Sequence, residues 1–435
     1  LHTSDWHLGQ HFMGKSRQAE HHTFCAWLIE QVREHEVDAL LIAGDVFDTG
    51  APPSYAREQY NRFIVELRGT RCALVVLGGN HDSVAMLGES KTLLAQLQTR
   101  VIPGASADLA EQVLVLNTRA GQPGAILCAI PFLRPRDLLQ SQAGQSAQDK
   151  QQSLQLAIQQ HYQALYALAE VRRDELGGDL PIVASGHLCT VGASASESVR
   201  EIYVGSLEAF PTSAFPPAAY IALGHIHRPQ RVGGLEHIRY CGSPIPLSFD
   251  EARQQKEVLL AELDGGGLRS VSVLPVPRFQ PLLSVRGSLK ELERAIAEAA
   301  QQGSAEQPVW LEVQVSSDDY LSDLQQRVAA LCEGLPVEVL RIRRERGTAV
   351  AGLQSQARET LDELSVGRSV RPPPAARATG RGRRAAAAGT LSRGAGRFAG
   401  RAGLSRQARV VFAWFVIFNP SEQALVSPLP QERGA

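Results

Sequence analysis

Short apolar segments that run into glycine and then into a residue type that can bind a metal recur along this chain, and this repetition constrains the fold more than any other feature. In the first, Val37–Val46, the apolar run leads into Gly44 and Asp45. Three later segments follow the same order: Ala73–Asp82, Pro181–His187 and Tyr220–His227. Short apolar runs bounded by glycine predict buried strands, each of which delivers a polar side chain at its carboxyl end.

Segments with helical periodicity lie between and after these strands. Glu20–His35 places Phe24 and Val32 on one side of a predicted helix, as in a helix that packs on a core. Tyr55–Arg68 and Gln151–Leu176 are expected to be helices as well. Strands that alternate with helices predict a layered α/β core.

The pattern changes after Pro277 to that of a smaller unit. Half-buried strands are expected at Gln280–Val285, Val309–Val315 and Val337–Arg343. Helices are expected between them, at Ser288–Gln302 and Tyr320–Cys332. This βαβαβ order predicts a second, small α/β domain.

Length and composition exclude several classes of protein. The 435 residues exceed one ordinary domain, so two or three domains are expected. No apolar run approaches the roughly 20 residues that span a bilayer, and no signal-peptide pattern lies near the start, so we expect a cytoplasmic protein that does not bind a membrane. The net charge of -1 argues against binding nucleic acid by bulk charge alone, but it allows a local basic groove. The six cysteines include no C-x-x-C pair, so neither a zinc site nor a disulfide framework is expected.

The polar residues at the strand ends point to a metal site. With Asp5-Trp6-His7 they form five elements in the order D-x-H, G-D, G-N-H-D, G-H and G-H-x-H. One such element is weak evidence, because a histidine at a strand end is more often a turn residue than a ligand. Five in one chain predict mixed imidazole and carboxylate ligands, which suit Mn, Fe or Zn better than Ca or an all-oxygen Mg site. Two such metals about 3.5 to 4 Å apart can hold a phosphodiester and stabilise the charge of an in-line displacement.

The motif series resembles that of the calcineurin-like metallophosphoesterases. Among these families, the chain resembles the SbcD family, the nuclease subunits of bacterial SbcCD complexes. Five stretches carry this resemblance: His2–Gln10, Gly44–Tyr55, Gly79–Ser83, Ile130–Asp137 and Tyr240–Phe249. The likeness extends from Leu1 to about Ser365. It implies an α/β fold, a four-layer metallophosphoesterase β-sandwich flanked by helices, with a small α/β capping domain that sits over the nuclease site and helps to admit DNA.

The resemblance also implies a role for each motif residue. Seven residues are implied as ligands of two divalent metal ions: Asp5, His7 and His227 for the first ion, Asn80, His187 and His225 for the second, and Asp45 as the bridge. His81 would face the scissile phosphate as a transition-state stabiliser or as proton donor to the leaving oxygen, and Asp82 would orient its ring. The metal preferred in this family is Mn²⁺. No substrate-binding residue is implied.

Domains and partners follow from the same resemblance. The implied domains are 1–277 for the nuclease, 278–347 for the capping domain, 348–365 for the start of the SbcC-binding region and 366–435 for a tail. The implied partners are DNA and the SbcC ATPase subunit, in a heterotetramer of two SbcD and two SbcC chains, where SbcC would use the ATP. The implied activities are an ATP-dependent 3′ to 5′ exonuclease on double strands and an endonuclease on single strands and hairpins, in DNA repair, recombination and replication.

Other functions fit the sequence less well. Phosphoprotein phosphatases place an arginine soon after the Gly-Asp element, where this chain has Asp48-Thr49-Gly50. Purple acid phosphatases supply a tyrosine there, where this chain has Val46 and Phe47. The enzyme alternative is a phosphodiesterase for nucleotides or other small molecules, against which the capping unit and the helix-rich insert argue. A scaffold without activity should have lost ligands, and none of the seven is missing.

The two ends of the chain depart from the family pattern. The stretch Val366–Val410 contains eleven Arg and no Asp, Glu or Lys, so it cannot bury a core. We hypothesise a frameshift near codon 366, which resequencing of the gene tests; a natural basic tail that contacts DNA is the alternative. At the other end, the chain begins at Leu1 without methionine, and we expect two or three further residues to complete the first strand.

Several other polar or aromatic residues have two interpretations. Trp6 is expected to pack in the core rather than stack on DNA, and Arg134 and Arg136 could contact phosphate or surface acids equally well. Surface positions are expected for three histidines: His11, His21 and His22. The small, polar stretch 192–198 is expected to be either a loop at the rim of the site or a simple connection.

Overall fold

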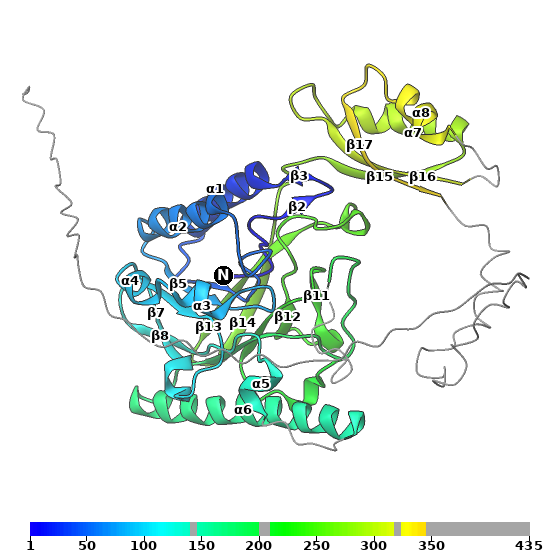
Figure 1. Cartoon of the computed structure of the whole chain (residues 1–435). Helices are drawn as coiled ribbons and strands as arrows, with labels where there is room; N and C mark the ends of the chain where they lie inside the picture. The colour runs from blue at the N-terminus through cyan, green and yellow to red at the C-terminus, as the bar shows by residue number, and fades with distance from the viewer. Residues whose placement is uncertain (140–145, 200–208, 317–322, 345–435) are drawn as a thin grey trace, which may run out of the picture. The chain divides into compact units, whose positions relative to one another are not determined.

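The computed structural model describes residues 1–139, 146–199, 209–316 and 323–344 (Figure 1). The described residues fall within one compact unit, Leu1–Arg358. The predicted SbcC-binding region, 348–365, and the predicted Arg-rich tail, 366–435, lie outside the described residues.

Two six-stranded mixed sheets form the centre of the larger domain. The first has the order β14 (Gly267–Pro275), β13 (Glu257–Asp264), β1 (His2–Thr3), β4 (Ala39–Ile42), β5 (Ala73–Leu77), β6 (Thr99–Ile102). The second has the order β11 (Gln230–Arg231), β12 (Ile238–Tyr240), β10 (Tyr220–Gly224), β9 (Ile182–His187), β8 (Pro123–Cys128), β7 (Val113–Asn117). Within them β1, β4, β5 and β6 run parallel, as do β8, β9, β10 and β12, so the carboxyl ends of these strands gather at one edge of each sheet.

Helices cover the outer face of each sheet. Helices α1 (Gln18–Glu34) and α2 (Ser54–Arg68) pack on the first sheet, and α6 (Ala147–Glu175) packs on the second (Figure 1). A separate apolar cluster lies between the sheets, where Leu41 and Val75 meet Leu127 and Val183. Short helices lie in the connections: α3 (Val84–Gly88), α4 (Lys91–Ala95) and α5 (Pro135–Leu138). The helix–sheet–sheet–helix order confirms the predicted four-layer sandwich.

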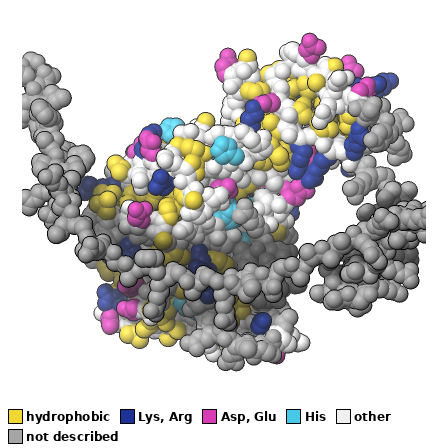
Figure 2. All heavy atoms as spheres, viewed as in Figure 1, with side chains coloured by type: hydrophobic (Ala, Val, Ile, Leu, Met, Phe, Trp, Pro, Cys, Tyr) yellow, Lys and Arg dark blue, Asp and Glu magenta, His cyan; other side chains and the backbone are white. Residues whose placement is uncertain are grey.

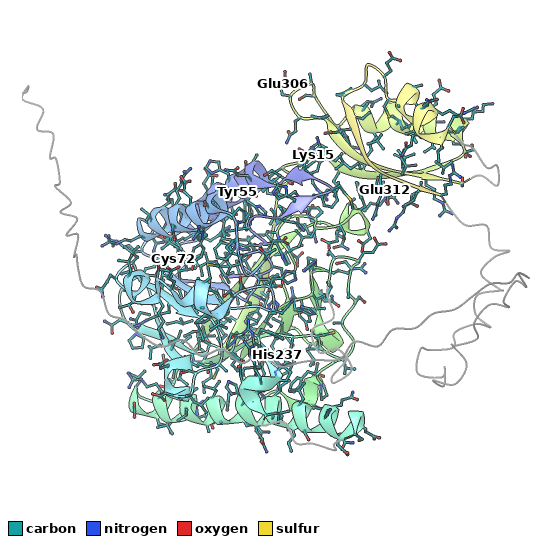
Figure 3. All side chains as sticks on the ribbon, viewed as in Figure 1. Lys15, Tyr55, Cys72, His237, Glu306 and Glu312 are labelled. Atoms are coloured by element: carbon teal, nitrogen blue, oxygen red, sulfur yellow. The ribbon has the colours of Figure 1, made fainter. Side chains whose placement is uncertain are left out.

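The smaller domain is the predicted βαβαβ unit. Its strands β15 (Leu282–Gly287), β16 (Val309–Val315) and β17 (Val337–Arg344) are all parallel. Helices α7 (Leu289–Ala300) and α8 (Leu324–Leu331) cover one face, where Leu292, Ile296 and Val328 pack on Leu311 and Val313. The other face of the sheet carries polar side chains such as Glu312 (Figure 3).

The strand sequences alone do not predict which strands pair with each other. The hairpin of β13 and β14 was not predicted, although β13 pairs antiparallel with β1 and completes the first sheet.

On the face shown in Figure 2, acidic, basic and hydrophobic side chains of the described residues are interspersed. Among the described residues, no helix combines the length and the apolar character needed to cross a membrane.

One stretch matches a phosphate-binding motif in its sequence but not in its structure. Gly9–Ser16 reads G-x-x-x-x-G-K-S, a pattern that cradles phosphates only as a loop of backbone N–H groups between a strand and a helix. Here β2 (His11–Phe12) pairs antiparallel with β3 (Lys15–Ser16), and Lys15 forms an ion pair with Glu338 on β17 (Figure 3). A tight hairpin with its lysine paired does not form such a cradle.

Two aromatic or histidine positions near the first motif are buried. Trp6 is in the core as predicted, where its Nε1–H donates to Thr3 Oγ1 at 3.0 Å and its ring meets Phe24 edge to face. The predicted surface position of His21 is wrong, because its ring is fully buried with Nε2 2.8 Å from the Trp6 carbonyl oxygen. His11 and His22 are exposed, as predicted.

Burial of His21 predicts a loss of stability in mild acid. Burial, together with nearby Arg17, lowers the pKa of His21 from 6.5 to about 3. Below pH 6.5 the unfolded chain therefore binds a proton that the folded chain does not, so this stabilisation is complete above pH 6.5 and is lost as the pH falls toward 3. The loss between pH 7 and pH 5 should be about 2 kcal/mol. Urea unfolding at both pH values measures it, and His21→Gln, which keeps a donor for Trp6, should lose about 2 kcal/mol less than the wild type. Equal losses in the two proteins would contradict this account.

Candidate metal centre

The seven predicted ligands all lie at the carboxyl ends of parallel strands. In chain order they stand at the ends of β1 (Asp5, His7), β4 (Asp45), β5 (Asn80), β9 (His187) and β10 (His225, His227). Because the two sheets are stacked and these strands end at corresponding edges, the fold brings the side chains together. All except the partly exposed Asn80 are at most 3% exposed.

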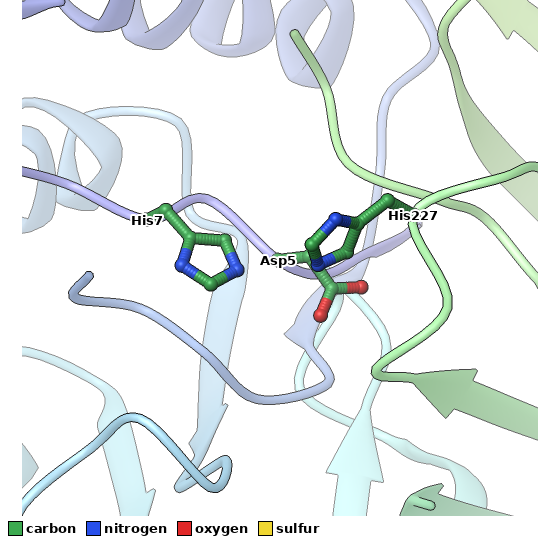
Figure 4. Close-up of side chains that lie close together, drawn as sticks. All are labelled: Asp5, His7 and His227. Carbon is green, nitrogen blue, oxygen red and sulfur yellow. The ribbon is translucent and has the colours of Figure 1, made fainter. Parts of the chain in front are cut away.

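The side chains form two adjacent groups. In one, the ligand atoms of Asp5, His7 and His227 all lie within 4.8 Å of one another (Figure 4). In the other, the ligand atoms of Asp45, His187 and His225 do the same. Asn80 belongs to the second group, since its Oδ1 lies 2.9 Å from His187 Nε2 and 3.1 Å from His225 Nδ1. Each group thus contains the residues that the resemblance assigns to one metal.

Asp45 stands between the two groups. Its Oδ2 lies 3.3 Å from His187 Nε2 in one group and 3.7 Å from His7 Nε2 in the other. Its Oδ1 accepts a hydrogen bond of 2.9 Å from the backbone N–H of His81. The Asp45 carboxylate is therefore within reach of both groups.

The backbone is strained where it delivers the ligands. Asp5, His7, Asp45 and His225 have φ values of 54°, 49°, 50° and 94°, a region that non-glycine residues seldom adopt. Such conformations persist where surrounding contacts hold them, and they concentrate at functional sites. Here each one turns the chain sharply at a strand end, so that the side chain points toward the neighbouring ligands.

The glycines of the motifs make room for ligands from adjacent strands. A Cβ at Gly44 would lie 2.2 Å from His187 Nδ1, and one at Gly79 would lie 2.1 Å from Asp45 Oδ1. Gly44 also has a φ of +95°, which an L side chain would strain. Packing at the site therefore requires the glycines of the Gly-Asp and Gly-Asn-His-Asp motifs.

Electrostatic coupling within the site is strong. Burial alone would raise the pKa of Asp45, but His187, His7 and His81 outweigh burial and hold that pKa well below its usual value. Burial would lower the pKa of His187, yet Asp45 raises it to about 9. A metal would have to displace the His187 proton, so metal affinity should fall as the pH falls.

The donor set fits divalent transition metals. The Nε2 atom of His7 is buried and forms no hydrogen bond with any described residue, which is costly for an imidazole unless a cation takes that position. The Nδ1 atom of the same ring lies 3.2 Å from Asp48 Oδ1. A carboxylate on one ring nitrogen orients the other toward a metal, so Asp48 is a site residue that the sequence-based assignment missed, although it stands in the same motif as Asp45.

His81 lies beside the first group, and the carboxylate of its neighbour Asp82 contacts backbone N–H groups. The His81 ring is 4.6 Å from the His7 ring between centroids, and its Nδ1 is 2.7 Å from the carbonyl oxygen of Asp48. The Asp82 carboxylate accepts backbone N–H bonds from Val46, Phe47 and Gly79 at 3.1, 3.0 and 2.8 Å. Asp82 thus ties the loop after β4 to the loop after β5, and the Asp48 carbonyl holds the His81 ring.

The structure gives the contacts of three other stretches that the sequence left open. The Nη2 of Arg134 donates to the carbonyl oxygens of Asp82 and Gly79 at 2.9 and 3.4 Å and so supports the His81 loop. Arg136 is exposed beside Asp137. The stretch 192–198 reaches the site, since Ser198 Oγ lies 2.6 Å from His227 Nδ1.

Both parts of the chain match known protein families. The calcineurin-like phosphoesterase family matches residues 1–229, and the Type 5 capsule protein repressor C-terminal domain matches residues 278–368. The chain is 56% identical over 367 residues to the SbcD subunit of the SbcCD nuclease of Escherichia coli (strain K12), and the match covers 84% of this chain and 90% of that protein. The SbcD subunits of Rhodobacter capsulatus and Bacillus subtilis (strain 168) are 35% and 27% identical, over 78% and 74% of this chain and 85% and 80% of theirs. A beta-glucosidase structure from Exiguobacterium marinum aligns with 75% of this chain and 78% of its own at a TM-score of 0.18 and 8% identity, and a likeness of that size carries no argument.

The contact of Asp48 with His7 predicts an effect on metal affinity. Replacing Asp48 with Asn removes the charge that orients and polarises the His7 ring, so Mn²⁺ binding should weaken by about tenfold or more. Isothermal titration calorimetry measures the affinity, with Asp174→Asn on the exposed end of α6 as the matched control. Unchanged Mn²⁺ affinity in Asp48→Asn would exclude this role.

Proposed function

The chain belongs to the SbcD family of calcineurin-like metallophosphoesterase nucleases, and on that premise we propose that it hydrolyses DNA phosphodiesters at the centre around Asp45. The observation that carries the proposal is the convergence of buried His and Asp side chains, from four strand ends, into two groups that lie on either side of Asp45. In this assignment the first cation is held by Asp5, His7 and His227 and the second by Asn80, His187 and His225, with Asp45 between them.

The metals supply one part of the chemistry and the chain supplies the rest. Two divalent cations, which we take to be Mn²⁺, would supply Lewis-acid stabilisation of the phosphate charge when bound at these ligands. Asp45 keeps the two ligand groups in register, and the strained turns at Asp5 and His225 fix the ligand directions before substrate arrives.

His81 is the residue assigned to the leaving group. Unlike the buried ligands it is partly exposed, so substrate can reach it. The Asp48 carbonyl accepts from Nδ1–H at 2.7 Å, which leaves Nε2 as the atom at which a proton is passed to the leaving oxygen. Arg134 and Asp82 hold the loop that carries His81.

The partners and domain limits are part of the same proposal. We assign DNA as substrate, in the cytoplasm, and an SbcC ATPase as partner in a complex of two chains of each, with exonuclease action on double strands and endonuclease action on hairpins. The proposed domains are 1–277, 278–347, 348–365 and 366–435. The C-terminal family match, which ends at residue 368, supports a change of character near 366.

Cleavage of a labelled DNA hairpin by the purified chain tests the proposal. Cleavage should require Mn²⁺, stop when EDTA removes the metal, and fall at least 100-fold in His81→Gln, because removal of a positioned general acid costs about 10² to 10⁴ in rate. His22→Gln, which changes an exposed histidine on α1, is the matched control and should cleave normally.

Two outcomes would overturn the assignment. Brisk hydrolysis of a small phosphodiester without cleavage of any DNA would favour a small-molecule phosphodiesterase. Full activity in His81→Gln would remove His81 from the proposed role.

A further inference from the structure

A buried ion pair lies directly behind the metal ligand His227. Glu251, in the short 3₁₀ turn η4 (Phe249–Glu251), is 0% exposed, and Lys256 is 2% exposed. Lys256 Nζ is 2.6 Å from Glu251 Oε2. Burying two charges is often no more stabilising than apolar packing of the same volume, so the pair calls for an explanation other than stability.

Both partners of the pair hold His227. Lys256 Nζ donates to the backbone carbonyl oxygen of His227 at 2.8 Å. Glu251 Oε1 lies 3.6 Å from His227 Nδ1, and the Ser198 hydroxyl bridges the two, since Ser198 Oγ is 2.6 Å from that nitrogen and donates to Glu251 Oε1. The main chain and the ring of this one ligand are therefore held from the same side.

The bridge fixes which nitrogen of His227 faces the metal. A serine hydroxyl has one hydrogen, and the Glu251 carboxylate can only accept, so the hydrogen of Ser198 points to Glu251. Ser198 Oγ must then accept from Nδ1–H of His227. This leaves the lone pair on Nε2, which is the atom available to a cation in the group with Asp5 and His7.

The same elements form the seat of the smaller domain. Phe249 of η4 packs with Phe12 and with Leu282 and Trp310 of the smaller domain, and the Arg341 guanidinium lies 5.1 Å above the Phe249 ring. Arg341, held by the buried Glu312 (Figure 3), and Arg343 reach Glu197, at 3.7 and 3.3 Å. Glu197 directly precedes Ser198 and donates its backbone N–H to Asp250 of η4 at 3.0 Å.

We propose that Glu251 and Ser198 are positioning residues that orient His227 for its metal and couple this orientation to the docking of β17. The proposal rests on the proposed function, because it takes His227 as a ligand of the first cation. It adds a specific route by which the smaller domain, through Arg341, Arg343 and Glu197, acts on the affinity of that cation.

Metal titration of variants of the full chain tests the route without relying on activity. Mn²⁺ binding is followed by calorimetry and by the Mn²⁺ electron paramagnetic resonance signal. Ser198→Ala should weaken one of two Mn²⁺ sites by about 10- to 100-fold, and Ser198→Thr, which keeps the hydroxyl, should restore most of the affinity. Ser270→Ala, which removes a serine bonded to Glu262 on the exposed β13–β14 hairpin, is the matched control and should bind as the wild type does.

A second set of variants separates positioning from folding. Glu251→Gln leaves Lys256 buried without its partner, so it is compared with Glu251→Gln/Lys256→Met, with circular dichroism to confirm the fold. Both should lose affinity at the same single site. Glu197→Gln and Arg343→Gln should each weaken it by about two- to fivefold, as for an exposed ion pair, and the double variant should lose no more than Glu197→Gln alone, because Glu197 also pairs with Arg341.

The outcomes distinguish this inference from the proposed function. Wild-type affinity in Ser198→Ala would overturn the positioning role while DNA cleavage stands. Wild-type affinity in both Glu197→Gln and Arg343→Gln would overturn the coupling to β17. Two tight Mn²⁺ sites without DNA cleavage by the wild type would overturn the proposed function and leave the positioning test valid.

Discussion

A buried carboxylate surrounded by imidazoles is the constraint on which the rest of this structure depends. Asp45 is 1% exposed and lies within 3.7 Å of two histidines from different strands. A charge in such a place must be compensated at short range, because the interior screens it poorly. Close approach requires the bare backbone of Gly44 and Gly79, and it requires the turns with positive φ that aim Asp5 and His225 inward. The parallel direction of the neighbouring strands meets this requirement, since strands that end at one edge deliver their side chains to one place.

Much of the fold can be predicted from the sequence because apolar runs and helical periodicity are recognised within a single segment. The segment Ala73–Asp82 contains its strand, its glycines and its site residues in ten consecutive positions, so apolar pattern and chemistry are seen together. The helices α1 and α2 begin and end within two residues of the predicted ranges, because their apolar stripes repeat along each segment. The four-layer sandwich and the parallel βαβαβ unit follow from the alternation of such segments.

The contacts that the sequence does not disclose are those between distant segments. A G-N-H-D motif shows that Asp82 follows His81, but not that its carboxylate turns away to bind the backbone of Val46 and Phe47, 36 and 35 positions earlier. Histidine is a residue type that is common at protein surfaces, and His21 is buried only because α1 packs against the turn that contains Trp6. Glu251 belongs to no short sequence motif, since its partner Ser198 lies 53 positions away. Periodicity indicates that a face is buried, but it does not say which polar group will meet it.

The ion pair behind His227 illustrates what apolar packing cannot supply. Hydrophobic residues of similar volume often replace a buried pair without loss, and sometimes stabilise the fold. They have no lone pair or proton, however, and so they cannot determine which imidazole nitrogen carries hydrogen. Glu251 does so through Ser198, and Lys256 keeps the carboxylate ionised while it holds the His227 carbonyl. The turn η4 carries Glu251 and also Phe249, which packs against Trp310 of the smaller domain. The same turn therefore selects the tautomer of His227 and contacts the smaller domain. In the proposed coupling, a displacement of the smaller domain changes the orientation of His227.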